Sequence, residues 1–244
     1  MFSLQANAAD VESWTNLARR CESAGFDALL AADHPGVTAS PFVALAAAAP
    51  VTSVIGLGSY VSNAGVREPL LLAADAATLD VLSGGRARLG LGAGHTPGEW
   101  DAVGRSRPDV GGRVRRCVAV AEAVRALLDG EEIDVDTSEL VARSARLSSP
   151  MPVQTRIPLT LGGSNSRLLR WAGAHADVVG LTGFGRTLAD GHNLRPTCWP
   201  RPSSSQGRRR RSFPPSKNTK GGGASPAMWT AWMRWTGWPR SCPS

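Results

Sequence analysis

Acidic residues are absent from the C-terminal segment of this 244-residue chain, and lysine is nearly absent from all of it. Residues 191–244 contain eight Arg, both Lys of the chain and no Asp or Glu, so they carry a charge of +10. Since the whole chain carries +7, residues 1–190 carry −3. The basic total therefore describes only the C-terminal segment, and the chain joins two different compositions.

Cysteine motifs are missing as well. The four cysteines, Cys21, Cys117, Cys198 and Cys242, form no C-x-x-C pair and have no metal-ligand spacing. We find no signal peptide and no apolar run of transmembrane length, since the run from Phe42 to Ala49 is far too short. We therefore expect free thiols in a reducing cytoplasm, and no membrane partner.

The signatures of several enzyme classes are also missing. The sequence has no H-x-x-x-H pair, no nucleophile elbow and no two acids at glycosidase spacing, and nothing in it suggests a metal site. The run Gly90-Leu-Gly-Ala-Gly-His95 fails the G-x-G-x-x-G spacing of a dinucleotide-binding fold. Alone, this run indicates tight packing at a strand end more than it indicates a phosphate loop.

What the sequence does contain is an alternation of short apolar strands with amphipathic helices. Capping residues or prolines begin most of the predicted helices, and glycines end three of them. The predicted strands cover residues 2–5, 26–32, 54–61, 87–91, 158–161 and 177–181. The predicted helices cover residues 11–24, 41–49, 69–82, 110–128 and 167–175, and residues 131–157 are expected to be an irregular connection.

This order repeats a strand and a helix about six times, and each crossover is long enough for a parallel unit. Both an open doubly wound sheet and a (β/α)8 barrel fit the order. Polar and glycine residues follow four strands, at Asp33-His34, Ser62-Asn63, Gly94-His95 and Gly162-Gly163-Ser164. A barrel would bring all four ends to one mouth, whereas an open sheet would spread them along an edge. The pattern alone favours the barrel only slightly.

Two of these strand ends are candidates for chemistry. A histidine beside a carboxylate, as in Asp33-His34, can hold one tautomer and move a proton. The alternative is a capping aspartate with a solvent-exposed histidine. Gly162-Gly163-Ser164 precedes a helix, whose N-terminal amides together with the hydroxyl of Ser164 suit an anion. The alternative there is a loop that merely turns sharply.

Five stretches together resemble the luciferase-like flavin and deazaflavin oxidoreductases, whose fold is a (β/α)8 barrel. They are residues 24–34, 40–45, 56–63, 79–95 and 157–181. The most specific match is Thr78-Leu-Asp-Val-Leu-Ser-Gly-Gly-Arg86 running into Leu89-Gly-Leu-Gly-Ala-Gly94. The resemblance covers roughly residues 2–190, and it is closest to the branch that uses coenzyme F420, a 5-deazaflavin, rather than FMN.

The resemblance implies roles for particular residues. Asp33 and His34 would lie beside the deazaflavin ring, with His34 transferring a proton. Tyr60, Val61 and Ser62 would form a bulge behind the ring, often with a cis peptide bond that does not involve proline. Further residues would hold the cofactor's polar tail and its phosphate, namely Ala93 and Gly94 for the tail and Gly162, Gly163 and Ser164 for the phosphate. Where several relatives place an acid after the fourth strand, this chain has His95 as the second catalytic candidate, with Glu99 four residues further on.

By this resemblance the protein is an enzyme that moves a hydride between F420 and a small organic substrate. An FMN-dependent monooxygenase that uses reduced flavin and oxygen is the alternative in the same fold. A homodimer is one assembly that the resemblance allows.

The pattern stops near Asp190, whereas relatives continue for about a hundred residues, so we expect an incomplete barrel of about six of the eight strands. Residues 1–190 would form the partial barrel domain, and residues 191–244 a disordered, basic tail rich in Pro, Arg and Trp. Arg208–Arg211 and the Trp-rich run 228–238 would suit nucleic acid or a membrane surface, since phosphates attract Arg and bases stack on Trp. The abrupt change of composition instead favours a truncated or frameshifted chain, so nucleic acid is disfavoured as a partner. An inactive remnant is the remaining alternative.

Overall fold

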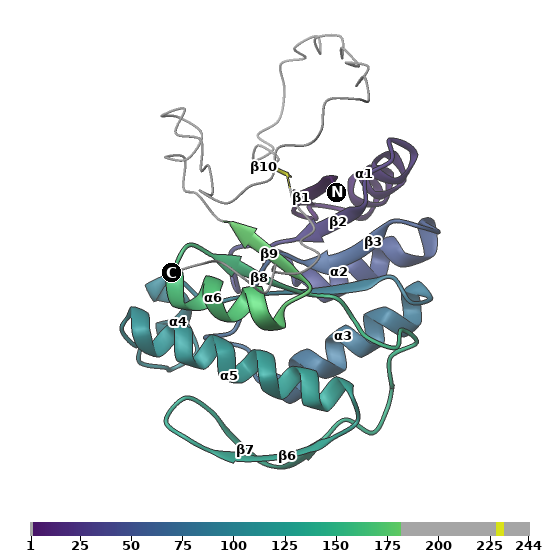
Figure 1. Ribbon diagram of the computed structural model, residues 1–244. Helices are drawn as coiled ribbons and strands as arrows, with labels where there is room; N and C mark the ends of the chain where they lie inside the picture. The colour runs from purple at the N-terminus through teal and green to yellow at the C-terminus, as the bar shows by residue number, and fades with distance from the viewer. Residues whose placement is uncertain (1, 182–227, 232–244) are drawn as a thin grey trace, which may run out of the picture. The chain divides into compact units, whose positions relative to one another are not determined.

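The computed structural model describes residues 2–181 and, for the backbone alone, residues 228–231. Six parallel strands lie side by side in the order in which they occur in the chain (Figure 1). They are β1 (Phe2–Ala6), β2 (Ala28–Ala31), β3 (Gly56–Ser59), β5 (Ala87–Gly92), β8 (Leu159–Gly163) and β9 (Val178–Leu181). The two-residue strand β4 (Ser62–Asn63) follows β3 and pairs with β5 further along.

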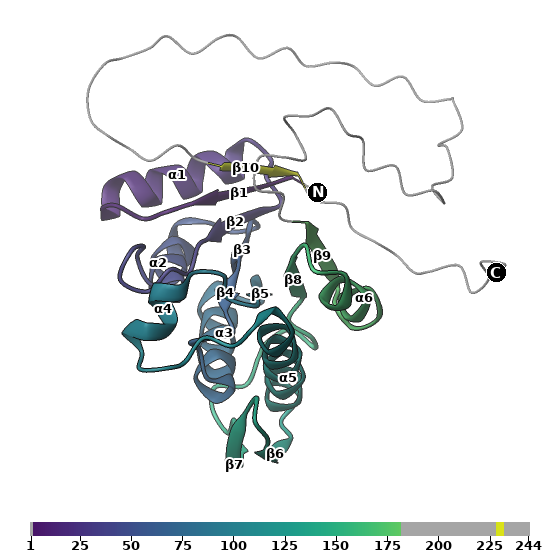
Figure 2. The ribbon, with the colours of Figure 1, turned by 90° about the vertical axis from the view of Figure 1, so that its left-hand side faces the viewer.

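The helices between these strands lie on the outer side of a curved sheet (Figure 2). They are α1 (Val11–Ser23), α2 (Pro41–Ala48, extended by the 3₁₀ turn Ala49–Val51), α3 (Pro69–Ser83), α5 (Val110–Leu128) and α6 (Ser166–His175). The side chains of Asp10, Asp109 and Asn165 accept first-turn amides of α1, α5 and α6, as N-caps do. Proline begins α2 and α3, and Gly84, with φ of 65°, ends α3 in the left-handed conformation.

The strands are buried on both faces. Leu29, Leu57, Leu89 and Leu161 are fully buried in the main core, which includes residues of helices α1, α2, α3, α5 and α6. Alternate positions, among them Ala28, Leu30 and Val178, form a second apolar cluster together with Tyr60. This two-sided burial explains why β2 and β9 are apolar throughout. Strands β1, β5 and β8 instead alternate apolar residues with Ser3, Arg88 and Thr160, which line the same space as Ala28 and Leu30.

The strand order decides between the two fold classes that the sequence left open. An open doubly wound sheet reverses its strand order at the crevice where it binds ligands. Here the six strands keep their chain order, the helices cover one side, and the sheet curves into half of a barrel. The predicted class, an incomplete (β/α)8 barrel with about six strands, is confirmed.

Two parts of the prediction were wrong or incomplete. Residues 131–157 are not wholly irregular, because β6 (Glu132–Asp136) and β7 (Val141–Arg146) form an antiparallel hairpin. Strand β6 alternates charged and apolar residues, as an exposed strand does, but the turn contains neither Gly nor Asn, so the turn signal of a hairpin is missing. Burial of Ile133 and Leu140 holds the hairpin instead. The short helix α4 (Pro97–Ala102) was not predicted either.

The backbone of Met228–Ala231 forms β10, which pairs antiparallel with β1. The remainder of the predicted tail, residues 191–227 and 232–244, lies outside the described residues. What the sequence predicts for that tail therefore stays a prediction.

Candidate functional site

The carboxyl ends of β2, β4, β5 and β8 bring most of the predicted site residues to one edge of the half-barrel. The parallel register sets this arrangement, since Ala31 pairs with Ser59, Ser62 with Leu91, and Gly92 with Gly162. The loops that leave these strands carry His34, the segment 60–62, the segment 93–95 and the segment 162–164.

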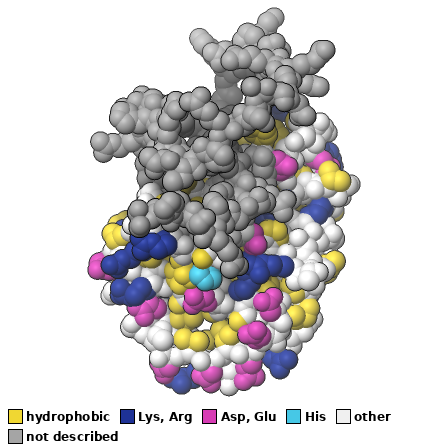
Figure 3. All heavy atoms as spheres, viewed as in Figure 1, with side chains coloured by type: hydrophobic (Ala, Val, Ile, Leu, Met, Phe, Trp, Pro, Cys, Tyr) yellow, Lys and Arg dark blue, Asp and Glu magenta, His cyan; other side chains and the backbone are white. Residues whose placement is uncertain are grey.

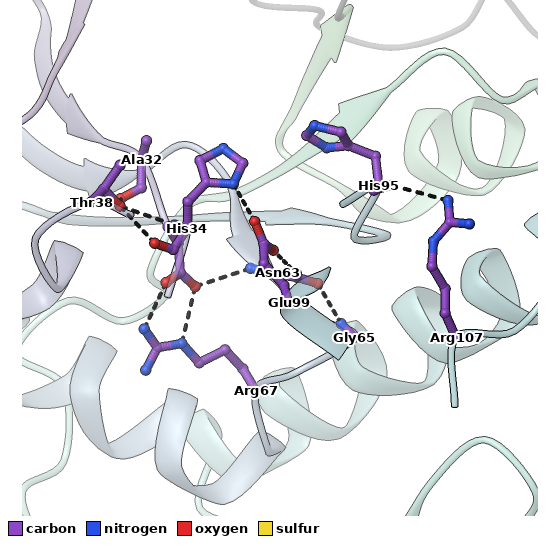
Figure 4. Close-up of polar contacts among 10 residues, drawn as sticks. Ala32, His34, Thr38, Asn63, Gly65, Arg67, His95, Glu99 and Arg107 are labelled. Carbon is purple, nitrogen blue, oxygen red and sulfur yellow. Dashed lines mark hydrogen bonds and ion pairs between the residues drawn. The ribbon is translucent and has the colours of Figure 1, made fainter. Parts of the chain in front are cut away.

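A hydrogen-bonded chain of side chains begins at His34 (Figure 4). The Nδ1 atom of His34 lies 2.6 Å from Oε1 of Glu99. The other carboxylate oxygen of Glu99 accepts a hydrogen bond of 2.5 Å from Nδ2 of Asn63, and Oδ1 of Asn63 accepts one of 2.8 Å from the Gly65 amide. The side chain of Glu99 is 5% exposed and that of His34 is 37% exposed. A ligand can therefore reach the histidine, whereas the carboxylate lies behind it.

Asp33 does not supply the carboxylate that contacts His34. Its oxygens accept hydrogen bonds of 2.6 and 3.0 Å from the guanidinium of Arg67 and one of 3.1 Å from the Asn63 amide. The hydrogen bond to Asp33 raises the pKa of Arg67, although burial of the guanidinium opposes this. Asp33 is 3% exposed and bound on both oxygens, so it ties the end of β2 to β4.

The short helix α4 delivers Glu99 to this position. Trp100, next to Glu99, is 2% exposed and packs on Gly65, where an added Cβ would lie 2.1 Å from the indole ring. Two arginines hold the same loop from behind, because Arg105 donates to the Gly65 carbonyl and Arg116 to the Ala64 carbonyl. Burial, and then Arg105, lower the pKa of Arg116 to about 10. The loop after β4 is thus fixed from several sides.

The segment 60–62 contains the cis peptide bond that the resemblance implies, between Tyr60 and Val61. Glycines on the neighbouring strands leave room for it. A Cβ added at Gly92 or Gly162 would lie 2.4 or 2.6 Å from a methyl group of Val61. Ser62 is buried, and Val61 is only partly buried. Gly92 therefore serves the close packing that the glycine run indicated, and Gly162 on β8 contacts Val61 in the same way.

The exit of β5 places His95 beside His34. The two rings meet edge to face, with centroids 5.6 Å apart and planes at 85°. Gly94 has φ of 69°, and a Cβ there would lie 2.2 Å from Oδ1 of Asn63, so no larger residue fits without displacing that side chain. The carbonyl of His95 accepts a hydrogen bond of 3.0 Å from Arg107. Ala93 is partly buried.

At the end of β8, Gly163 is partly buried and Ser164 is exposed. The first amides of α6 are less available than the sequence suggested, because the side chain of Asn165 accepts from the Arg167 and Leu168 amides at 3.0 and 3.3 Å. Asn165 is the N-cap of α6, which its place before the helix could have indicated. The Ser164 hydroxyl and the first amide of the helix remain for a ligand.

Sequence reasoning missed Asn63 and Arg67 as site residues, and it noted Glu99 without assigning it a partner. Asn63 stands at a strand end, which was a usable signal. Nothing local in the sequence pairs Arg67 with Asp33, or Glu99 with His34, since 34 and 65 residues separate them.

Within residues 2–181, no three His, Cys, Asp or Glu side chains are grouped so that they could hold a metal ion. No helix in the described part of the chain has the length and apolar character that a membrane span requires.

The sequence matches the family model described as luciferase-like monooxygenase over residues 2–197, which makes the half-barrel one of a class of oxidoreductases. The chain belongs to this family. An uncharacterized protein of Mycobacterium tuberculosis is 37% identical over 153 residues, which cover 62% of this chain and 52% of the relative. The F420-dependent glucose-6-phosphate dehydrogenase of Beutenbergia cavernae is 31% identical over 188 residues, which cover 73% of this chain and 54% of the relative.

Solved structures show the same fold. The coenzyme F420-dependent tetrahydromethanopterin reductase of Methanopyrus kandleri superposes with a TM-score of 0.63 at 25% identity, over 74% of this chain and 54% of that one. The oxygenating constituent of the 3,6-diketocamphane monooxygenase of Pseudomonas putida, in complex with FMN, has a TM-score of 0.57 at 20% identity. It covers 67% of this chain and 49% of that one. The chain spans about half the length of the curated relatives it matches.

Proposed function

We propose that this chain is an F420-dependent oxidoreductase that acts on a small organic substrate. When bound, the deazaflavin would supply or accept a hydride at its C5 atom. Two F420-dependent proteins support this choice over FMN, because the Beutenbergia cavernae dehydrogenase is 31% identical over 73% of the chain and the solved Methanopyrus kandleri reductase is 25% identical over 74% of it.

The observation that carries the proposal is the pairing of His34 with Glu99. A carboxylate bound at Nδ1 of an imidazole favours the tautomer with its hydrogen on Nδ1. The Nε2 atom of His34 is then left to take a proton from a substrate or to return one. Because Glu99 is buried and Asn63 holds its second oxygen, the imidazole keeps one orientation as a general acid or base must.

The residues at the mouth fit a flat, largely uncharged ring. The two methyl groups of Val61 lie against Gly92 and Gly162, so its apolar side chain is held at the ends of β5 and β8. In this proposal Tyr60, Val61 and Ser62 back the ring and Asp33 fixes the loop that carries Asn63. Ala93, Gly94, Gly163 and Ser164 lie at the adjacent strand ends and would hold the polar tail.

Fluorescence titration of the full chain with F420 and with FMN tests the proposal. We expect saturable binding of F420 and weaker binding of FMN. Val61→Arg should abolish F420 binding, because the longer charged side chain would occupy the space in which the deazaflavin ring is proposed to lie. Val54→Arg is the matched control, since Val54 is 77% exposed and precedes β3 at the opposite end of the strand.

Tighter binding of FMN than of F420 would favour the flavin-dependent alternative. A folded chain that binds neither would contradict both assignments and support an inactive remnant.

A further inference from the structure

Glu99 differs from the other buried acids in the groups that hold it. On the face of the molecule in Figure 3, acidic side chains lie at the surface, several of them beside basic ones. Three acids in the described part of the chain are instead buried, namely Asp33, Asp80 and Glu99. An arginine binds Asp33, and backbone amides bind Asp80. Among the described residues, the carboxylate of Glu99 makes hydrogen bonds only with the side chains of His34 and Asn63.

The side chain of Asn63 donates to Glu99 from a fixed position. Its Nδ2 atom donates to Oε2 of Glu99 at 2.5 Å, and its Oδ1 atom accepts the Gly65 amide at 2.8 Å (Figure 4). Because a backbone N–H can only donate, the atom that faces Gly65 is the oxygen, and the NH2 group therefore faces Glu99. A Cβ added at Gly94 would collide with this amide, so the backbone there packs closely against it. Asn63 has no second orientation that keeps both hydrogen bonds.

The backbone of Asn63 is held as well. Its N–H donates to Asp33 at 3.1 Å, and its carbonyl accepts the amides of Val66 and Arg67 at 3.1 and 3.0 Å. This turn returns the guanidinium of Arg67 to Asp33. Asn63 is 4% exposed, and all of its polar atoms are hydrogen bonded within the protein. We therefore expect a side chain of the same shape at position 63 to occupy the same place.

The donor at position 63 bears on where the hydrogen of the His34–Glu99 contact lies. A hydrogen bond donated to a buried carboxylate stabilises its ionised form, and an ionised carboxylate can only accept. Nδ1 of His34 must then carry the hydrogen, which leaves Nε2 free to take a proton. A protonated Glu99 would instead donate to Nδ1, and the hydrogen of neutral His34 would lie on Nε2. The group that faces the far oxygen of Glu99 thus decides which nitrogen of His34 can act as a base.

We propose that Asn63 is a positioning residue that keeps Glu99 ionised and thereby keeps the hydrogen of neutral His34 on Nδ1. Asn63 acts through Glu99 and does not itself contact the bound molecule. The inference rests on the proposed function, since Nε2 of His34 is the atom that takes a proton there. An amide is required at position 63, because an aspartate of the same shape would turn an oxygen toward Glu99. Two carboxylates at that distance have to share one proton.

Exchanging the amide and the carboxylate between positions 63 and 99 tests this role. In Glu99→Gln, the NH2 group of Asn63 should attract the oxygen of the new amide, whose own NH2 group then faces Nδ1 of His34. We expect the hydrogen of neutral His34 to move to Nε2. In Asn63→Asp/Glu99→Gln, the new carboxylate should accept from that NH2 group and turn the amide round, which returns the hydrogen to Nδ1. The ¹⁵N shifts of the His34 ring, measured above the pH range in which histidine is protonated, distinguish the two tautomers.

Asn16→Asp/Glu99→Gln is the matched control. Asn16 is exposed on α1, so the same added charge there should leave the hydrogen of His34 on Nε2. A role of Asn63 in packing alone would give one tautomer in Glu99→Gln and in Asn63→Asp/Glu99→Gln, and that result would overturn the proposal.

Urea denaturation of the same variants gives a second readout. Asn63→Asp alone should lower the urea midpoint, and adding Glu99→Gln should raise it again, since each polar atom regains a partner. A double variant no more stable than Asn63→Asp would also overturn the proposal. Neither measurement needs a bound cofactor. Failure to bind F420 would therefore contradict the proposed function, whereas the tautomers of His34 test the role of Asn63 separately.

Discussion

The Nδ1 atom of His34 and the Oε1 atom of Glu99 lie 2.6 Å apart, although 65 residues separate them in the chain. The contact joins the end of β2 to α4, the helix that follows β5. It predicts that neutral His34 carries its hydrogen on Nδ1. The ¹⁵N shifts of the two ring nitrogens, measured above the range in which histidine is protonated, distinguish the two tautomers.

Glu99→Ala should remove this preference and give a mixture of tautomers, because no carboxylate then binds Nδ1. Asp101→Ala is the matched control, since Asp101 is exposed on the same helix. Finding the hydrogen on Nε2 of wild-type His34 would contradict the assigned role of Glu99.

Gly162→Ala should displace Val61. The added methyl group would lie 2.6 Å from Cγ1 of Val61, so we expect a loss of about 1–3 kcal/mol in the free energy of unfolding, as for an overpacked core. Urea denaturation measures this loss. Gly98→Ala is the control, because nothing lies within 4 Å of its added Cβ, and in α4 it should be neutral or stabilise by up to about 1 kcal/mol. Equal stability of the Gly162→Ala and Gly98→Ala variants would show that the packing against Val61 does not need a glycine at position 162.

Asp80 supports the base of the half-barrel. Its fully buried carboxylate accepts hydrogen bonds from the amides of Ala87, Val153 and Gln154 and from the side chain of Gln154, at 2.6–3.2 Å. Asp80→Ala leaves these donors unpaired in the interior, and we expect a cost of about 3 kcal/mol or more. Asp129→Ala, at an exposed helix end, should cost less than about 0.5 kcal/mol in the same thermal or urea measurement. Similar losses of unfolding free energy in Asp80→Ala and Asp129→Ala would contradict the role assigned to Asp80.

The pH dependence of stability should contain a contribution from Glu22. Burial opposes ionisation of Glu22, but the amides of Val54, Ile55 and Ser53, together with Arg86, outweigh it and lower the pKa of Glu22 below its ordinary 4.5. A carboxylate with a lowered pKa in the folded state stabilises the fold above the unfolded-state pKa. That contribution is lost as the pH falls below 4.5 and through the folded-state pKa.

Glu22→Gln should therefore flatten the fall in unfolding free energy between neutral pH and strongly acidic pH. Denaturant titrations at a series of pH values measure the slope. A variant with the slope of the wild type would contradict the proton linkage assigned to Glu22.

The elements of the fold were largely readable from the sequence, and the reasons are local. Real helix ends are marked by the prolines that begin α2 and α3, by the aspartate caps of α1 and α5 and by the glycine after α3. Curvature of the sheet was not readable locally, since it depends on strand order. The hairpin of β6 and β7 was missed because burial of two side chains, rather than turn chemistry, holds it.

The site was only partly readable. The strand ends gave His34, the segment 60–62 and the glycines, because parallel strands end at a common edge. The position of Glu99, the partner of His34, depends instead on Trp100, which packs on Gly65 and so orients α4. The stretch 78–86, the most specific part of the resemblance, makes structural contacts through Asp80 and Arg86, whose guanidinium donates to the Thr52, Ile55 and Ala49 backbones. A match to the family in this stretch is therefore evidence for the barrel fold more than for the reaction that the barrel carries out.

The most direct test of the account is equilibrium dialysis of the full, folded chain against coenzyme F420. The account predicts retention of one F420 per chain at saturation, with the retention lost in Val61→Arg and kept in Val54→Arg. Circular dichroism of each sample verifies that the helices and strands are formed. A folded wild-type chain that retains no F420 would contradict the central claim that the edge formed by β2, β4, β5 and β8 is a deazaflavin site.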